Sequence, residues 1–200
     1  MPANSPDPAP LTVEARTASL TLTADNVRVA VTGNIYVAPV GAVAPTDANT
    51  ALNPAWKALG YLSEDGISLT PSKVDTTSIT AWQNSAEVRK TVTKIENTVE
   101  FTMIETNSAT LEFFGSAVID TGKKSWTFGG SGLGKKALII DWIDGSNEHR
   151  LFIPQAEVTD RGSIEYKNGS PVGYKVTVSA YPDSSLGNLP FKEFASVALA

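Results

Sequence analysis

Hydrophobic and polar residues alternate along most of this chain, which is the period of a β-strand and not of a helix. The stretch NVRVAVTGNIYVAPVG, which begins at residue 26, repeats this pattern at nearly every second position. Its alternating apolar residues are Val27, Val29, Val31, Ile35 and Val37. The pattern predicts a strand that begins after residues 1–25, a segment rich in Pro, Ala, Ser and Thr.

Two further stretches alternate as cleanly, so each predicts a strand with one apolar and one polar face. The apolar positions are Val99, Phe101 and Met103 in NTVEFTMIE, and Tyr174, Val176 and Val178 in YKVTVS. The polar positions between them are Thr98, Glu100, Thr102, Lys175, Thr177 and Ser179. A continuous apolar run, Ala-Leu-Ile-Ile at 137–140, predicts a central strand.

Turn-forming pairs between apolar runs predict β-hairpins. They lie at Asp144-Gly145, at Asn168-Gly169 in SIEYKNGSPVGYKVTVSAYP, and at Asp65-Gly66 in GYLSEDGISLTP. The last pair raises a second possibility, because Glu64 and Asp65 are adjacent carboxylates. A general acid and base need two carboxyl groups held in different environments, whereas these two share one exposed turn. The turn is therefore favoured over a catalytic pair.

A polar stretch rich in Thr, Ser, Val and Ile predicts a long, solvated hairpin over 72–90 that turns near Gln83-Asn84-Ser85. Such a hairpin buries too little to be stable alone, so we expect a neighbouring subunit to support it. Trp82 lies close to the predicted tip. It is either a core residue or an interface anchor, since tryptophan serves in both places.

One helix is predicted, in TNSATLEFFG. Asn107 or Thr106 can cap its N-terminus, Leu111 and Phe114 share an apolar side, and Gly115 ends it. A helix of roughly two turns is not stable alone, so it must pack on the sheet.

The domain organisation follows from these elements. Residues 1–25, rich in Pro, Ala, Ser and Thr, predict an extended N-terminal arm, and residues 26–185 a single domain. Residues 186–200 form a short tail whose possible anchors are Leu189, Phe191 and Phe194. The predicted fold class is mainly β: an antiparallel β-sandwich or barrel with one short flanking α-helix and extended terminal arms.

Composition excludes several classes of protein. The formal net charge of -5 and the scattered Lys and Arg residues argue against a protein that grips nucleic acid. The chain has no cysteine, so disulfides and thiolate metal sites are excluded and folding in a reducing cytoplasm is expected. No apolar run is long enough to cross a bilayer, so no membrane partner is expected. The start, MPANSPDPAP, lacks the features of a secretory signal.

Three apparent motifs are weak. GGSGLGKK at 129–136 resembles a phosphate-binding loop, but Lys136 replaces the required hydroxyl residue and a strand is predicted to follow. His149 is the only histidine and is expected to be exposed or half-buried on a strand, which disfavours zinc or a catalytic triad. Asn168-Gly169-Ser170 matches a glycosylation sequon but is expected to be only a turn. We assign no catalytic, cofactor-binding or metal-binding residue.

The order of several segments resembles a known family. These segments are GNIYVAPVG, AWKALGYLSEDGISLTPSK, ITAWQNSAEVRKT, EFTMIETN, RLFIPQAEVTD and GYKVTVSAYPD. Together they are similar to the major tail proteins of long, non-contractile-tailed phages, and most of all to those of phages that infect actinobacteria. The likeness covers roughly residues 30–183. It implies hexameric rings that stack into a tail tube around a tape measure protein, through which double-stranded DNA later passes without specific binding. Tail terminator and tail tip proteins are further implied partners, with assembly in the host cytoplasm and final location in the virion tail.

The resemblance also assigns roles to residues. Contacts between subunits are expected from the long hairpin and the terminal arms, at Val74, Ile79, Trp82, Asn84, Val88, Arg89, Leu11 and Val13. An acidic channel would repel phosphates and let DNA slide. From alternation alone, Asp75 and Glu100 are the carboxylates expected to face it.

Two alternatives remain open at this point. A β-sandwich module could bind carbohydrate or a receptor at a virion tail, with Trp56, Trp82, Trp126 or Trp142 as the platform for a sugar ring. A hydrolase with Glu64 and Asp65 as an unusual carboxylate pair is the second.

Overall fold

The computed structural model describes residues 24–122, 124–129 and 134–197. The chain divides into two compact units: Met1–Val29 with Leu199–Ala200, and Ala30–Ala198. In the first unit the described residues hold one short 3-10 helix, η1 (Ala24–Asn26). The expected interface residues Leu11 and Val13, and most of the expected arm at 1–25, lie outside the described residues.

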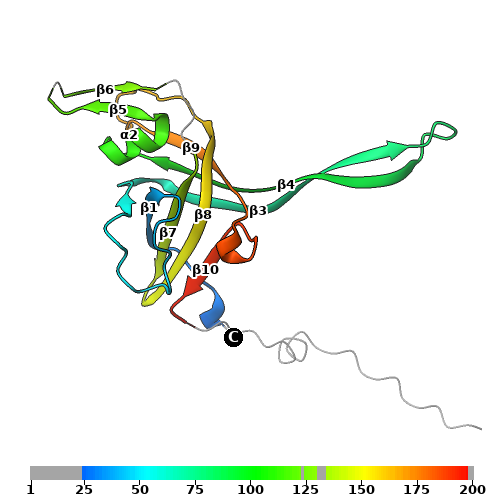
Figure 1. Cartoon of the computed structure of the whole chain (residues 1–200), viewed down its shortest axis with the longest axis horizontal. Coiled ribbons are helices and arrows are strands. Elements are labelled where there is room, and N and C mark those ends of the chain that lie inside the picture. Colours follow the sequence, from blue (N-terminus) through cyan, green and yellow to red (C-terminus); the bar gives the residue numbers. More distant parts are fainter. Residues whose placement is uncertain (1–23, 123, 130–133, 198–200) are drawn as a thin grey trace, which may run out of the picture. The chain divides into compact units, whose positions relative to one another are not determined.

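The second unit is built almost entirely from antiparallel strands (Figure 1). The first strands are β1 (Thr32–Pro39), β2 (Lys57–Ala58), β3 (Leu62–Thr80), β4 (Glu87–Met103), β5 (Ala117–Asp120) and β6 (Ser125–Phe128). The later strands are β7 (Lys136–Asp144), β8 (Asn147–Arg161), β9 (Tyr174–Ala180) and β10 (Lys192–Ala195). The helices are α2 (Ser108–Gly115) and a 3-10 turn, η2 (Ser184–Leu186). The predicted mainly β fold with one short α-helix is confirmed.

One sheet runs in the order β2-β1-β7-β8-β9-β4-β3, with β10 also paired to β8. Strand β8 joins its two halves, since residues 147–156 pair with β7 and residues 156–161 pair with β9. The two halves pack their apolar faces together as the layers of a sandwich, and α2 covers one end (Figure 1). This core contains the predicted apolar faces of β4 and β9, including Val99, Met103 and Val178, each fully buried.

The central strands are buried on both faces. On the side of β1, β7 and β8 away from the main core, Ile139 and Phe152 form a second cluster with Trp56. Trp56 comes from the loop between β1 and β2 and donates its indole N–H to the carbonyl of Val43 at 3.1 Å. The prediction of a central strand from the continuous apolar run at 137–140 is therefore confirmed, because this part of β7 has no solvated face.

Helix α2 has the predicted cap. The Asn107 side-chain oxygen accepts the backbone N–H of Thr110 at 2.9 Å, and Leu111 and Phe114 are buried. The last helical residue is Gly115, as predicted, but the left-handed residue is Ser116. Gly115 is required for another reason: a Cβ there would lie 2.3 Å from the ring of Phe128 on β6.

The predicted first strand is wrong in its N-terminal part. β1 begins only at Thr32, and Val27, Val29 and Val31 are exposed, although the N–H of Val31 donates to the carbonyl of Ile143. Alternation marked these valines as a strand. Among the described residues they have no partner strand, and a strand forms only where a neighbour supplies hydrogen bonds.

The predicted turn at Asp65-Gly66 is also wrong. β3 runs straight through this point, and between the pairs Leu62↔Met103 and Ile67↔Phe101 it carries extra residues that form a large β-bulge. Gly66 has a φ of 69°, which a bulge requires as often as a turn does. The true reversal occurs only at the end of the long hairpin.

The predicted Asn168-Gly169 turn is present between the paired strands β8 and β9, but the loop that contains it is longer than predicted. The chain from 162 to 173 is irregular, Tyr166 is 80% exposed, and β9 pairs with the end of β8 and with β4. The segment from Ser163 to Ser170 is mostly polar, and only Ile164 packs against the core, so it has no alternating apolar face that would make it a strand.

The C-terminal segment contains a strand that the sequence analysis does not predict. β10 pairs with β8 from Lys192↔Phe152 to Ala195↔His149. Phe191 and Phe194 pack against the two clusters, whereas Leu189 is 59% exposed. Two of the three expected anchors therefore contact the core.

Candidate assembly surfaces

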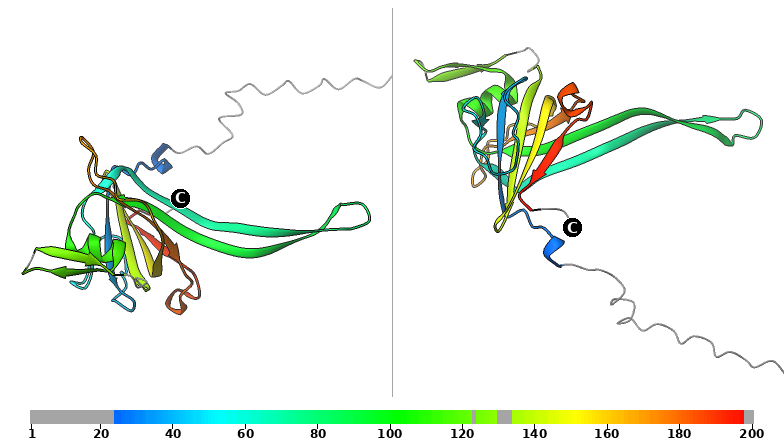
Figure 2. Two further views of the ribbon diagram at one scale, coloured as in Figure 1. Left: turned by 90° about the horizontal axis from the view of Figure 1, so that it is seen from above. Right: turned by 60° about the horizontal axis from the view of Figure 1, so that its bottom comes forward.

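The most prominent feature of the second unit is a two-stranded ribbon that leaves the sandwich (Figures 1 and 2). β4 pairs with β9 only from Thr98 onward, so residues 87–97 of β4 are paired with β3 alone. The ribbon closes through the Ala81 N–H, which donates to the Ala86 carbonyl at 2.8 Å, and Ser85 has a φ of 54°. The hairpin and its turn near residues 83–85 are thus as the sequence predicts.

The ribbon has one apolar face. Val74 pairs with Ile95 and Thr76 with Val92, and alternate residues of a strand share a face. Val74, Val92 and Ile95 are 47%, 54% and 61% exposed, although a fully buried apolar side chain of this size would stabilise a protein by about 1.5–3 kcal/mol. Within the described residues nothing covers them.

The opposite face of the ribbon is mixed. Asp75 pairs with Lys94, and Ile79 pairs with Arg89. Lys94 also forms an ion pair with Glu96, which raises the pKa of Lys94 and lowers that of Glu96. The Lys94 side chain is 58% exposed and that of Glu96 26%, so solvent screens the pair and it adds little stability.

The expected interface residues therefore fall on three surfaces. Val74 lies on the apolar face, and Ile79 with Arg89 on the mixed face. Trp82 is at the tip, where the Asn84 side chain accepts the N–H of Ala86 at 3.1 Å and shapes the turn. Val88 lies at a register shift near the tip.

Sequence analysis missed Val92 and Ile95 because they are three residues apart, which breaks the alternation of a strand. The reason is an extra residue, Thr93, at a register shift, whose hydroxyl donates to the Asp75 carbonyl at 3.1 Å. The only available signal was that both residues are β-branched and lie opposite the predicted partner strand.

Trp82 is 96% exposed. Its alternative placement in the core is therefore wrong. An indole offers about 150–250 Å² of surface for burial, and leaving it in water at the end of a ribbon is unfavourable. Tryptophan is also the residue type most enriched among interface anchors.

The sheet face formed by β3, β4 and β9 is polar where the sequence predicts it. Glu100 accepts from the ammonium of Lys175 at 2.8 Å and from the hydroxyl of Thr177 at 3.5 Å. The hydrogen bond with Lys175 lowers the pKa of Glu100 and raises that of Lys175. Asp75 lies on the ribbon six positions from Glu100 by the register of β4, about 20 Å along a strand, so the two expected channel carboxylates do not form one cluster.

An apolar groove of about 520 Å³ lies between α2 and the strands β1, β2 and β7. Val37, Ala109, Phe113 and Ala117 are among the residues that line it. Its charged residues are Lys57, Lys136 and Glu112. This groove is the most apolar concave surface described on the second unit.

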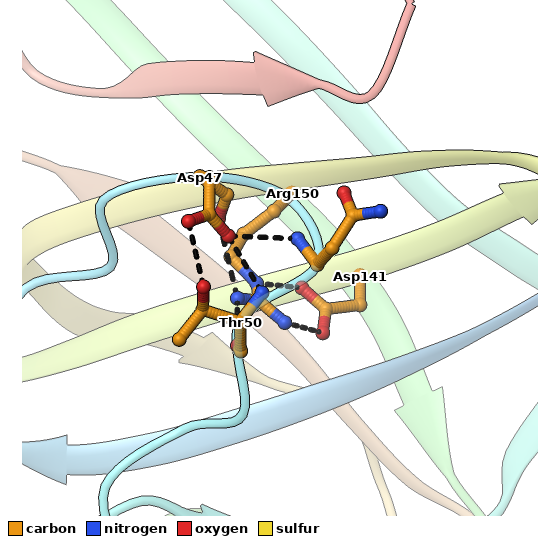
Figure 3. Close-up of polar contacts among 5 residues, drawn as sticks. Asp47, Thr50, Asp141 and Arg150 are labelled. Atoms are coloured by element: carbon orange, nitrogen blue, oxygen red, sulfur yellow. Dashed lines mark hydrogen bonds and ion pairs between the residues drawn. The ribbon is translucent and has the colours of Figure 1, made fainter.

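A charged cluster fixes the long loop between β1 and β2 (Figure 3). Arg150 on β8 donates to both carboxylate oxygens of Asp141 on β7, and its remaining nitrogen donates to the carbonyls of Asp47 and Thr50. Four of the five N–H groups of the guanidinium thus donate within the chain, and the hydrogen bonds to Asp141 raise the pKa of Arg150. The arrangement is structural, because the Arg150 side chain is only 7% exposed and all three of its nitrogens donate to groups of this chain.

The residues considered for catalysis and those considered for sugar binding lie on separate elements, and Trp126 on β6 is 45% exposed. Glu64 and Asp65 lie exposed in the bulge of β3, where the Ser63 hydroxyl donates to Asp65. Trp56 is buried, which removes it from the sugar-platform alternative. The ring of Trp142 is stacked on His149 with 3.8 Å between centroids.

His149 itself is buried, not exposed or half-buried as predicted. Its Nδ1 lies 3.4 Å from a carboxylate oxygen of Glu193 on β10, and its Nε2 has no hydrogen-bond partner among the described atoms. Lys136 begins strand β7, so no helix follows the GGSGLGKK segment, whose residues 130–133 lie outside the described ranges. Searches of the described residues find no metal-ligating cluster and no helix long and apolar enough to span a membrane.

The fold and these surfaces define a structural β-sandwich with a long ribbon that its own described residues do not support. A comparison with protein families matches residues 20–189 to the phage tail tube protein family. The chain belongs to this family, and its role is that of a structural component of a virion tail. A comparison with curated proteins gives no match.

Proposed function

We propose that copies of this chain close into hexameric rings, which stack into the tail tube of a long, non-contractile-tailed phage of an actinobacterial host. The observation that carries the proposal is the ribbon. It exposes Val74, Val92, Ile95 and Trp82, and an isolated two-stranded ribbon is marginally stable in water. Packing against a second copy supplies the missing burial.

Open strand edges support ring formation. Among the described strands β3 pairs only with β4, β2 only with β1 and β10 only with β8, so the sheet has three strands with an unpaired edge. Exposed edges invite uncontrolled pairing, and closing a sheet through neighbouring copies removes them. Contacts between two different surfaces of one chain form a ring when the rotation closes and a filament when it does not.

The polar face of β4 and β9 suits the channel. Thr98, Thr102 and Thr177 present hydroxyl groups there, and Glu100 is neutralised by Lys175. Where β4 and β9 pair, over Thr98–Met103 and Tyr174–Ser179, Lys175 is the one ammonium group and is already paired, so this part of the surface offers DNA phosphates no free cation. Such a channel takes a tape measure protein first and passes DNA later, with tail terminator and tail tip proteins at its ends and assembly in the host cytoplasm.

Electron microscopy of the concentrated protein, and of virions, tests the proposal. We expect rings or tubes with a central channel in purified protein and the same chain along the tail of the virion. A protein that remains monomeric at every concentration and is absent from the tail shaft contradicts it.

A further inference from the structure

We propose that the Trp82 tip of one copy docks into the apolar groove between α2, β1, β2 and β7 of a second copy. The inference deepens the proposed function and rests on it, because it names the acceptor surface for the ribbon. It joins two features that are otherwise unexplained: an indole that is 96% exposed and a groove of about 520 Å³ lined mainly by apolar side chains.

The sizes agree. Pockets that enclose small ligands or anchor side chains measure about 300–1,000 Å³. The groove, at about 520 Å³, takes an indole together with part of the turn that carries it. Another groove of similar size, about 590 Å³, has apolar lining residues too, but its charged residues are the carboxylates Glu64 and Glu105, which would repel the acidic Glu87 of the tip.

The tip and the groove cannot meet within one copy. The ribbon leaves the sandwich on the side away from α2 and β2, and both views of Figure 2 agree on this with Figure 1. From Thr98 to Glu87 it extends for eleven residues, or about 35 Å. Docking must therefore join two copies head to tail, which is the kind of contact that propagates into rings or stacks.

The charges also agree. Glu87 is the charged residue of the tip segment 81–87, and it is exposed. Two lysines, Lys57 and Lys136, line the groove together with Glu112. Glu87, which pairs with Thr80 at the base of the turn, therefore meets an excess of positive charge when the tip docks, and this favours the proposed register over others.

Substitution of the indole is the first test. Trp82→Ala should raise the concentration needed for tube assembly at least about tenfold, as truncation of an anchor does. Trp82 contacts little in its own chain, so the thermal unfolding of the monomer should be unchanged. Tyr166→Ala is the matched control, since Tyr166 is another 80% exposed aromatic residue, and it should assemble normally.

The groove is tested from the other side. Ala55 lines it and is exposed in the single chain, so Ala55→Glu should leave the fold intact and weaken assembly as strongly as Trp82→Ala. Combining Glu87→Lys with Lys57→Glu and Lys136→Glu should restore part of the assembly that the lysine reversals remove.

Disulfide trapping identifies the contact directly, because the chain has no cysteine of its own. A Gln83→Cys variant mixed with a Lys57→Cys variant should give a linked dimer under oxidation, in addition to any product of either variant alone. Gln83→Cys mixed with Lys167→Cys, a control on the 162–173 loop, should not.

The outcomes separate this inference from the proposed function. If the wild type forms tubes and Trp82→Ala forms them equally well, the docking is wrong and the tube stands. If Ala55→Glu alone weakens assembly, the groove holds another segment, and the docking is again wrong. If the wild type forms neither rings nor tubes, the proposed function itself fails.

Discussion

Arg150 and Asp141 face each other across β7 and β8 and are joined by two parallel hydrogen bonds of 2.8 Å each. The same guanidinium holds the carbonyl of Thr50 at 2.8 Å and that of Asp47 at 3.2 Å (Figure 3). One side chain thus ties the 40–56 loop to the central strands. That loop carries Trp56, which covers the outer cluster, and Ala55, which lines the groove.

Loss of this guanidinium should be costly. The Arg150 side chain is 7% exposed, so Arg150→Met leaves the Asp141 carboxylate largely buried without its partner, and we expect the free energy of unfolding to fall by about 2–4 kcal/mol. Lys167→Met removes an exposed ion pair with Glu165 and should cost at most about 1 kcal/mol. Urea unfolding of both variants measures this, and equal losses contradict the assignment.

The same loop should be sensitive to acid. Hydrogen bonds from Thr50 and Asn49 lower the pKa of Asp47 to about 2 from its ordinary 3.8. A lowered carboxyl pKa stabilises the folded state above pH 3.8, and this contribution is lost as the pH falls through about 2. Thr50→Val removes the side-chain hydrogen bond that lowers the pKa of Asp47 most, so the loss of stability should occur at a higher pH.

Stability curves from pH 5 to pH 2 and a titration of the Asp47 carboxyl by nuclear magnetic resonance check this. In Asp47→Asn, the free energy of unfolding should lack the part of the decrease between pH 5 and pH 2 that comes from protonation of Asp47. If the wild type and Asp47→Asn lose stability in parallel, Asp47 has no role in the acid response.

The helix cap gives a third prediction. The Asn107 side-chain oxygen accepts the backbone N–H of Thr110. Its side-chain nitrogen donates to the Leu59 carbonyl and to the Glu105 carboxylate, at 3.2 Å in both cases. Asn107→Ala should destabilise the protein by about 1–2 kcal/mol. Asn107→Asp keeps the acceptor and should cost less. An equal loss in both variants, measured by chemical denaturation, means that the donated bonds and not the cap dominate.

Excision of the ribbon tests assembly without disturbing the sandwich. Val74 pairs with Ile95, so residues 75–94 can be replaced by Asn-Gly, a pair that forms a tight hairpin turn. We expect a folded monomer, with the core of β4 and β9 unchanged, that does not form tubes. Light scattering and electron microscopy are the measurements, and tubes of normal length from this variant contradict a role for the ribbon in stacking.

Local pattern predicted the fold where the alternation of a strand's own residues decides which of its faces is buried. The apolar faces of β4 and β9 are buried as alternation indicates, and the run at 137–140 is central. The pattern failed where partner choice decides the structure. Asp65-Gly66 fits a turn and a bulge equally well, and only the pairing of β3 with β4 selects the bulge.

The assembly surfaces were harder to predict for a physical reason. Trp82 and Val74 could be named because exposed apolar residues in a polar hairpin are conspicuous. Ile95 and Val92 share the face of Val74 only because a register shift realigns them, and sequence spacing hides that shift. The groove draws on four elements far apart along the chain, so no local pattern reveals it.

Two register shifts between β3 and β4, at Asp75/Thr76 and at Ile79/Thr80, interrupt the ribbon and limit how it can aggregate. A long exposed ribbon with valine and isoleucine is a template for amyloid, in which flat strands from many copies add in register. Each shift leaves a residue unpaired and increases the local twist, so a second ribbon cannot zip along it over more than a few residues. The exposed ribbon can thus remain in solution until it binds a complementary surface, without nucleating fibres.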